Sequence, residues 1–327
     1  MNKVARMPPK QRAEIFRECA AKRGVREIVI EKDFWVCWVL QKLYGHDMLR
    51  NNIMFKGGTS LSKVFNVIER FSEDIDLVLN WNLLRISRFP EGGSGKAKKN
   101  WYVELKQKSC EFVEDKIYPI VKDLVGDLCD LDINTSGDTA KIFIDYPSSF
   151  TDEYIEGRIF LEIGPRSAWK PNASHDIKSY VAEEFPDVVS DPIASVHVIK
   201  VERTFWEKVL ILHQEHHRSA DKQLRDRYSR HYYDVVMMCK KGVKDSAIID
   251  LALCEQVVTF KKQFFPSSWG RDDFAKPGTF ALMPNKSFID RLKKDYADME
   301  QMIFGEYPDF EELLIVIGEL EKEVNSQ

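Results

Sequence analysis

The sequence predicts a protein of the α/β (α+β) class, with a mixed sheet in its first half and helices in its second half. Apolar segments of strand length recur over 52–57, 74–80, 129–134, 140–145 and 157–164. From about residue 198 onward, apolar residues instead recur at helical spacing. The chain has 327 residues, 44% of them hydrophobic, which is enough for one large or two ordinary domains.

Helices and a domain boundary complete this prediction. Before the first strand, residues 8–24 and 31–44 have helical patterns, and a longer helix is expected over 102–125. Pro90 to Lys99 is rich in glycine and lysine and is expected to form a surface loop. Four prolines and weak periodicity over 165–195 mark a joint, placed at 169–195. It would connect a first domain at 1–168 to a helical domain at 196–327, with helices near 229–241, 245–264, 286–303 and 309–324.

Two aspartates in one predicted strand form the first candidate site. Asp74 and Asp76 are two residues apart, so both carboxylates project from one face of the strand while Ile75 and Leu77 face the core. Carboxylates held about 7 Å apart repel each other, and a shared hard cation such as Mg²⁺ relieves that repulsion. Ser72 would share this face, where its hydroxyl could contact metal-bound water or phosphate, or serve no chemistry.

A glycine pair precedes the aspartates by one predicted helix. Gly57 and Gly58 permit a tight turn after the strand at 52–57, and their backbone amides can approach a ligand closely. Thr59 is expected to cap the following helix, which carries an apolar stripe at Leu61, Val64, Phe65 and Ile68. The helix N-terminus would point at phosphate, with Thr59 and Ser60 in its first turn and Lys63 one turn in.

Five ordered segments resemble a known family. They are Lys56–Lys63, Arg70–Leu77, Glu31–Val36, Arg203–Lys208 and Arg230–Asp234. A glycine pair followed by Asp-x-Asp on the next strand resembles the polymerase-β-like nucleotidyltransferase superfamily. The complete set is more similar to one branch of it, the AbiEii-type abortive-infection toxins of bacteria.

The resemblance implies a function and further site residues. The fold would be a nucleotidyltransferase core with a mixed sheet and a C-terminal helical domain that closes over the active-site cleft. Asp74 and Asp76 would hold two Mg²⁺ ions, with Mn²⁺ as a substitute, Lys208 would contact the triphosphate, and Asp234 would complete the site. The enzyme would transfer a nucleoside monophosphate from an NTP to RNA, at the 3′ end of tRNA, and so block translation. A separate antitoxin protein would be its partner.

Three candidate site residues, namely Glu162, Lys208 and Asp234, have other interpretations. Glu162 shares a strand face with Phe160 and Gly164, and the superfamily commonly takes a third acidic metal ligand from a later strand, but Glu162 could equally pair with Arg158 or Arg166. Lys208 could be a surface residue beside Glu207, and Asp234 could simply cap or pair within a helix.

Composition limits the classes of protein that the chain can belong to. No run approaches the roughly 20 apolar residues that span a bilayer, and a cytoplasmic location is expected. The six scattered cysteines indicate reduced, buried thiols. A net charge of −4 argues against a general electrostatic grip on nucleic acid, although two local basic clusters could bind RNA or could be solvated helix faces. They are Lys96, Lys98, Lys99, Lys106 and Lys108, and then Arg218, Lys222, Arg225, Arg227 and Arg230.

Two other functions stay open at this point. The chain could be a catalytically silent module that senses nucleotides or binds an antitoxin in phage defence. It could also transfer nucleotides to a protein side chain or a small molecule. The complete set of acidic and basic residues favours an enzyme over the first of these.

Overall fold

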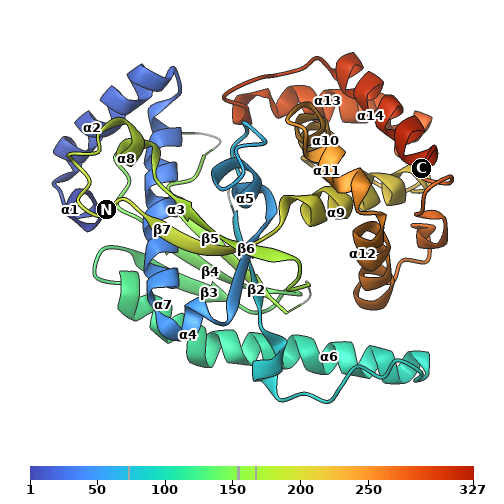
Figure 1. The fold of residues 1–327 in the computed structure, drawn as a ribbon. Helices are drawn as coiled ribbons and strands as arrows, with labels where there is room; N and C mark the ends of the chain where they lie inside the picture. Colours follow the sequence, from blue (N-terminus) through green and yellow to red (C-terminus); the bar gives the residue numbers. More distant parts are fainter. Residues whose placement is uncertain (73, 153–154, 166–167) are drawn as a thin grey trace. The chain divides into compact units, whose positions relative to one another are not determined.

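The computed structural model describes residues 1–72, 74–152, 155–165 and 168–327. Its contacts divide the chain into two compact units, which Figure 1 shows in sequence colours. The first unit contains Met1–Val64 and Ser72–Ile199, and the second contains Phe65–Phe71 and Lys200–Gln327. The chain therefore leaves the first unit for seven residues, returns, and leaves it again at residue 200.

The first unit contains a seven-stranded sheet with the order β3-β4-β5-β2-β1-β7-β6. β2 runs parallel to β5 and β1 runs parallel to β7, while the remaining neighbours are antiparallel. The predicted mixed sheet is therefore confirmed. The strands are β1 (Ile53–Lys56), β2 (Asp74–Leu79), β3 (Asp130–Asn134), β4 (Ala140–Asp145), β5 (Arg158–Gly164), β6 (Asn172–Ile177) and β7 (Ala194–Ile199).

Helices cover one face of this sheet. The long helix α3 contacts β7 and β5 and contributes Trp35 and Trp38, which are fully buried in the core. The predicted helices at 8–24 and 31–44 correspond to α2 and α3 and are confirmed. The helices are α1 (Asn2–Ala5), α2 (Pro9–Arg23), α3 (Glu27–Gly45), α4 (Asp47–Arg50), α5 (Gly57–Lys63), α6 (Gly95–Phe112), α7 (Tyr118–Val125) and α8 (Tyr180–Glu184), with a 3₁₀ turn at Trp81–Leu84 and a π-helical turn at Val113–Ile117.

Alternation along β5 and β4 separates a buried face of the sheet from a more open one. Ile159, Leu161 and Ile163 are buried, whereas the residues between them are only partly buried. β4 shows the same pattern, with Ile142 and Ile144 inside. A period of two along a strand places successive side chains on opposite faces. The open face therefore carries the polar and aromatic residues of these strands.

The predicted joint at 169–195 is wrong. The segment contains β6, α8 and the start of β7, and β7 lies next to β1 inside the sheet. The boundary between the units falls after Ile199 instead. β6 is an edge strand with little buried surface, so its sequence lacks the apolar pattern of a strand. Pro171 and Pro192 lie outside the strands and do not interrupt them.

The predicted surface loop at 90–99 is wrong from Gly95 onward, where α6 begins. The Ser94 hydroxyl accepts a hydrogen bond from the Ala97 amide and caps the helix. Trp101 is buried, donates from its indole nitrogen to the Ser87 carbonyl at 2.8 Å, and contacts the ring of Phe89. This packing anchors the first turns of α6.

The second unit is helical, as predicted, and Phe65–Phe71 packs within it. The expected helix at 245–264 is divided at Asp250, whose carboxylate accepts a hydrogen bond from the Leu253 amide and starts a new helix. No helix in the described part of the chain is long and apolar enough to cross a membrane. The helices are α9 (Val201–His216), α10 (Arg230–Lys240), α11 (Val243–Ile249), α12 (Leu251–Phe264), α13 (Ile289–Asp298) and α14 (Phe310–Asn325), with 3₁₀ turns at Asp272–Phe274, Lys286–Phe288 and Glu300–Met302.

Candidate active site

The open face of the sheet brings the acidic residues of two strands together. Asp74 and Asp76 are partly exposed, while Ile75 and Leu77 are buried on the other side of β2. In the parallel pairing of β2 with β5, Asp76 lies opposite Glu162 and Asp74 lies opposite Phe160. Neighbouring strands are about 4.8 Å apart, so the two aspartates and Glu162 form one acidic group. The predicted strand and its shared face are confirmed.

Gly57 makes room for the carboxylate of Asp76. A Cβ atom on Gly57 would lie 1.8 Å from Oδ2 of Asp76, which no real contact allows, and the residue has a φ of +83°, in the left-handed region. Lys56 pairs with Asp76 across β1 and β2, which brings the glycine to this position. Only glycine satisfies both the conformation and the close approach, so the glycine pair and the Asp-x-Asp strand form one unit of structure.

The helix after the glycines differs from the prediction. α5 begins at Gly57 itself, with Lys56 as the N-cap, so Thr59 lies inside the helix and the prediction that it caps the helix is wrong. Its hydroxyl instead donates to the Asp74 carbonyl, and the Ser60 hydroxyl donates to the Gly57 carbonyl at 2.8 Å. The Thr59 bond ties the first turn of α5, which includes Gly58, to β2, and the Ser60 bond lies within that turn.

The predicted apolar stripe is also only partly present, because α5 ends at Lys63. Leu61 is buried within the helix, while Val64 follows it and Phe65 and Ile68 belong to the second unit. The reason is that Phe65–Phe71 pairs with distant residues of the second unit, which overrides the helical spacing in this segment. Ser72 lies before the first residue of β2, so its predicted place on the strand face is wrong.

Lys63 forms a buried ion pair. Its ammonium is 2.7 Å from Oδ1 of Asp33 and 3.9 Å from the centre of the Tyr180 ring. Burial alone would lower the pKa of Lys63, but the charge of Asp33 raises the pKa above its usual value, so the ammonium remains charged. The other Asp33 oxygen accepts the Tyr180 amide at 2.6 Å. Asp33 thus fixes both the end of α5 and the start of α8.

Glu162 has partners other than the predicted arginines. Its Oε2 is 3.0 Å from Nζ of Lys141, and its Oε1 accepts the Thr139 hydroxyl at 3.0 Å. Arg158 pairs with Asp145 instead, and Arg166 lies outside the described residues. Burial alone would lower the pKa of Lys141, but Glu162, with Asp74 and Asp76, raises it. The charge of Lys141 therefore compensates the acidic group.

The acidic face fits a magnesium ion that is shared with a substrate. Mg²⁺ is usually held by one or two carboxylates together with substrate phosphates, and less often by a cage of protein ligands alone. The partly exposed aspartates supply hard oxygen donors for such a shell. Within the described residues no three His, Cys, Asp or Glu side chains are close enough to hold a metal ion by themselves.

The second unit brings together two other predicted site residues. Lys208 Nζ lies 2.6 Å from Asp234, and Asp234 also accepts two hydrogen bonds from Arg70, at 2.6 and 2.8 Å. Lys208 does not pair with Glu207, which contacts Arg203. All three members are buried, and Asp234 has no exposed surface. Together Arg70, Asp234 and Lys208 form a buried ionic triad.

Electrostatics in the triad keep the aspartate charged. Burial alone would raise the pKa of Asp234, but Arg70 and Lys208 hold it well below its usual value. Burial and the charge of Arg70 lower the pKa of Lys208, while Asp234 opposes this shift. One buried carboxylate therefore balances two cations, which makes the triad sensitive to the loss of its single acid.

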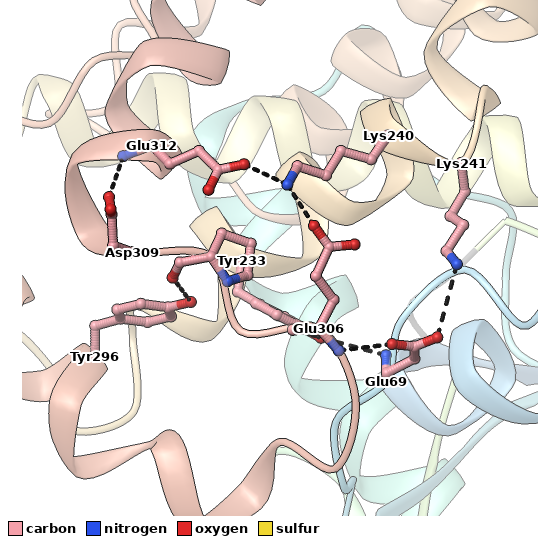
Figure 2. Close-up of polar contacts among 9 residues, drawn as sticks. Glu69, Tyr233, Lys240, Lys241, Tyr296, Glu306, Asp309 and Glu312 are labelled. Carbon is pink, nitrogen blue, oxygen red and sulfur yellow. Dashed lines mark hydrogen bonds and ion pairs between the residues drawn. The ribbon is translucent and has the colours of Figure 1, made fainter.

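The segment Phe65–Phe71 is attached to the second unit at several points besides Arg70. The Phe71 amide donates to the Met302 carbonyl at 2.7 Å and the Phe304 amide to the Glu69 carbonyl at 2.9 Å. Figure 2 shows the carboxylate of Glu69 accepting the Glu306 amide and facing Lys241, beside Tyr233. In the same view Lys240 bridges Glu306 and Glu312. The residues just before β2 are therefore held by the helical unit.

The Glu31–Val36 segment has a structural role that sequence reasoning did not assign. Glu31 accepts the Ser148 hydroxyl and the Ser149 amide, both at 2.7 Å, and burial raises its pKa although these donors lower it. Lys32 donates to the carbonyls of Glu156 and Arg158, ahead of and at the start of β5. Each charged residue of the motif thus binds a distant segment of the first unit.

Sequence reasoning missed the partners Asp33, Arg70 and Lys141. Asp33 and Arg70 stand inside segments already quoted for the family resemblance, so their presence there was a usable signal. Lys141 carries no such signal, because only the register of β4 with β5 brings it to Glu162.

A pair of aspartates on one strand, beside a glycine that begins a helix after the neighbouring strand, is the arrangement for which the sequence resembles nucleotidyltransferases. The family model for the AbiEii nucleotidyltransferase toxins of type IV toxin–antitoxin systems matches residues 38–316, and the chain belongs to this family. The family places the protein among nucleotidyltransferase enzymes that act in a toxin–antitoxin system.

One solved structure supports the fold. The chain is similar to MenT4, a nucleotidyltransferase toxin from Mycobacterium tuberculosis H37Rv, with a TM-score of 0.52 and 13% sequence identity. The match covers 95% of this chain and 90% of MenT4. No curated protein sequence matches the chain.

Proposed function

We propose that this protein transfers a nucleoside monophosphate from an NTP to the 3′ end of a tRNA and thereby blocks translation. The observation that carries the proposal is the acidic face of β2, where Gly57 leaves room for Asp76 beside Asp74. The family supplies the reaction class, a nucleotidyltransferase that is the toxin of a toxin–antitoxin pair. The tRNA acceptor, the metal ions and the roles of the site residues go beyond the family and belong to our proposal.

Asp74 and Asp76 would hold Mg²⁺, for which Mn²⁺ could substitute. When bound, two such ions supply Lewis-acid activation of the acceptor hydroxyl and neutralise charge on the phosphates. The protein contributes the position of the carboxylates, since both aspartates belong to β2 and Gly57 leaves room for the carboxylate of Asp76. Glu162 is the third candidate ligand, and it would have to exchange its bond to Lys141 for the metal.

The first turn of α5 would hold the phosphates of the NTP. Backbone amides of Gly57, Gly58, Thr59 and Ser60 are suited to phosphate oxygens, and the hydroxyl bonds of Thr59 and Ser60 keep this turn rigid. Lys63 supplies positive charge near the turn, although Asp33 holds its ammonium. Ser72, Lys208 and Asp234 remain predicted site residues.

A basic helix in the first unit supports RNA as the acceptor. Within the described residues Lys96 and Lys99 form no ion pair, and both are exposed on α6. Lys106 pairs with Asp138, next to the Thr139 that binds Glu162, so this part of α6 lies near the acidic group. In a chain of net charge −4, this segment is locally basic, with Arg85, Arg88, Lys96, Lys98, Lys99, Lys106 and Lys108 against Glu91 and Glu104.

The second basic cluster supports RNA less well. Arg218 is paired with Glu215 through two hydrogen bonds, at 2.5 and 2.6 Å, and Lys222 lies near Asp221. Local acids therefore offset part of this cluster, and α6 is the better candidate for phosphate contacts.

Labelled nucleotides test the proposal directly. The pure protein is incubated with each α-labelled NTP, Mg²⁺ and total RNA, and the products are separated into RNA and protein. Label in tRNA, dependent on Mg²⁺, is the expected result. Label in the protein fraction would move the acceptor to a protein, and no label with any NTP would favour a silent module that binds nucleotide or antitoxin.

A further inference from the structure

Two phenylalanines lie on the same sheet face as the catalytic aspartates. Phe160 on β5 is the direct neighbour of Asp74 on β2, and Phe143 on β4 is the direct neighbour of Phe160. The rings meet edge to face, with centroids 5.5 Å apart and an interplanar angle of 80°. Both side chains are only partly buried, because they belong to the open face of the sheet. We call this pair the aromatic platform.

Cations flank the platform on both sides along the strands. Lys141 precedes Phe143 by two residues and pairs with Glu162, and the Arg158 guanidinium lies 5.5 Å from the centre of the Phe143 ring. Asp145 holds Arg158 by two hydrogen bonds, at 2.7 and 2.9 Å. Aromatic rings between cations form the arrangement that proteins use for single-stranded nucleic acid, since bases stack on the rings and phosphates contact the cations.

The order of the strands indicates which substrate would meet the platform. β1 and α5, which would hold the NTP phosphates, lie on one side of β2, while β5 and β4 lie on the other. In phosphoryl-type transfer the attacking and leaving oxygens are roughly in line with the phosphorus. If pyrophosphate leaves toward α5, the acceptor hydroxyl must approach from the side of β5. The platform is therefore on the acceptor side of the aspartates.

We propose that Phe160 and Phe143 stack the terminal base of the RNA acceptor and so present its 3′ hydroxyl to Asp74 and Asp76. This inference rests on the proposed function and deepens it, because a protein or small-molecule acceptor would not need a base-stacking surface. It also accounts for two large apolar side chains that are left partly exposed beside a charged site. A cross-strand aromatic pair that only stabilises the sheet is the competing explanation.

Binding of an RNA that lacks one base tests the platform without any need for catalysis. A short oligoribonucleotide is compared with the same RNA lacking its last base, in Mg²⁺ and without NTP. For the wild type, loss of the base should weaken binding about tenfold, in the range expected for one stacked base. For Phe160→Leu and Phe143→Leu, the intact RNA should bind as weakly as the RNA without the base, and removal of the base should have no further effect.

Phe274→Leu is a matched control, because Phe274 is 43% exposed and has the Arg271 guanidinium 4.5 Å from its ring centre. It should bind both RNAs as the wild type does. Equal affinity of wild type and the two platform variants for the intact RNA, or an unchanged penalty for the missing base in those variants, would overturn the platform. The proposed function is tested separately by transfer of label, so each idea can fail without the other.

In turnover, the platform variants should raise the KM for RNA and leave the KM for the NTP near the wild-type value. A rise in the KM for the NTP alone would contradict the assignment to the acceptor side. Circular dichroism and thermal unfolding of each variant show whether the sheet remains folded. Phe160→Trp is the rescue variant, since a larger ring should retain the base-dependent binding.

Discussion

Substitution of Gly57 by alanine separates the geometry of the active site from general stability. Alanine at a positive φ costs roughly 1–2 kcal/mol in backbone conformation. In addition, its Cβ would lie 1.8 Å from Oδ2 of Asp76, whereas real Cβ contacts are essentially never under 3.0 Å. The carboxylate must therefore move by about 1 Å, a displacement that can cost on the order of 100-fold in rate. We expect Gly57→Ala to lose activity far beyond its loss of stability.

The matched controls are Gly24→Ala and Gly278→Ala, at φ values of +66° and +85° with no heavy atom within 4 Å of the added Cβ. They carry the same backbone strain without the contact with Asp76. Thermal unfolding should show similar destabilisation for all three variants, while nucleotide incorporation and its dependence on Mg²⁺ concentration should change only for Gly57→Ala. Wild-type incorporation by a folded Gly57→Ala protein would refute the role of the glycine.

Three further predictions concern the ionic groups. Asp234→Ala leaves Arg70 and Lys208 buried without a counter-charge and should destabilise the protein by about 3–5 kcal/mol in chemical denaturation. Lys208→Met should destabilise it less, because Asp234 stays paired with Arg70. Equal effects of the two substitutions would argue against the triad. The pKa of Asp234 is lowered in the folded state, so its charge stabilises the fold above the unfolded pKa of about 3.9, and this stabilisation is lost as the pH falls. The difference in unfolding free energy between wild type and Asp234→Asn should therefore shrink in acid. A difference that stays constant with pH would contradict this. The double variant Lys96→Gln with Lys99→Gln should lower the slope of log binding constant against log salt concentration, for RNA, by up to about 0.7–0.9 per lost phosphate contact. Lys286→Gln is the control and should leave the slope unchanged. An unchanged slope in the double variant would be the contrary result.

Local patterns predicted the strands that carry the site. The alternation Asp74, Ile75, Asp76, Leu77 gives both the strand and its exposed face, and Glu162 lies on the predicted face of β5. These features depend on a period of two residues, which neighbours along the chain can supply. The edge strand β6 has no such signal, because most of its residues are polar and β7 is its one neighbour in the described part of the sheet.

Contacts between distant residues could not be predicted in this way. Arg70 and Asp234 are 164 residues apart in sequence, and no local pattern indicates that they meet. The contact of Gly57 with Asp76 depends on the register of β1 with β2, and the pairing of Lys141 with Glu162 depends on the register of β4 with β5. Sequence reasoning therefore identified the candidate residues, whereas the structure gave their partners.

The most direct test of the central claim is the rate of nucleotide incorporation into RNA by Asp74→Asn and Asp76→Asn. Asp130→Asn, at an exposed strand position of β3, is the matched control. The account predicts that both site variants fold, lose at least about 100-fold in rate and lose Mg²⁺ dependence, as expected when a group that stabilises the transition state is removed, while the control keeps wild-type activity. Full Mg²⁺-dependent incorporation by either folded site variant would contradict it.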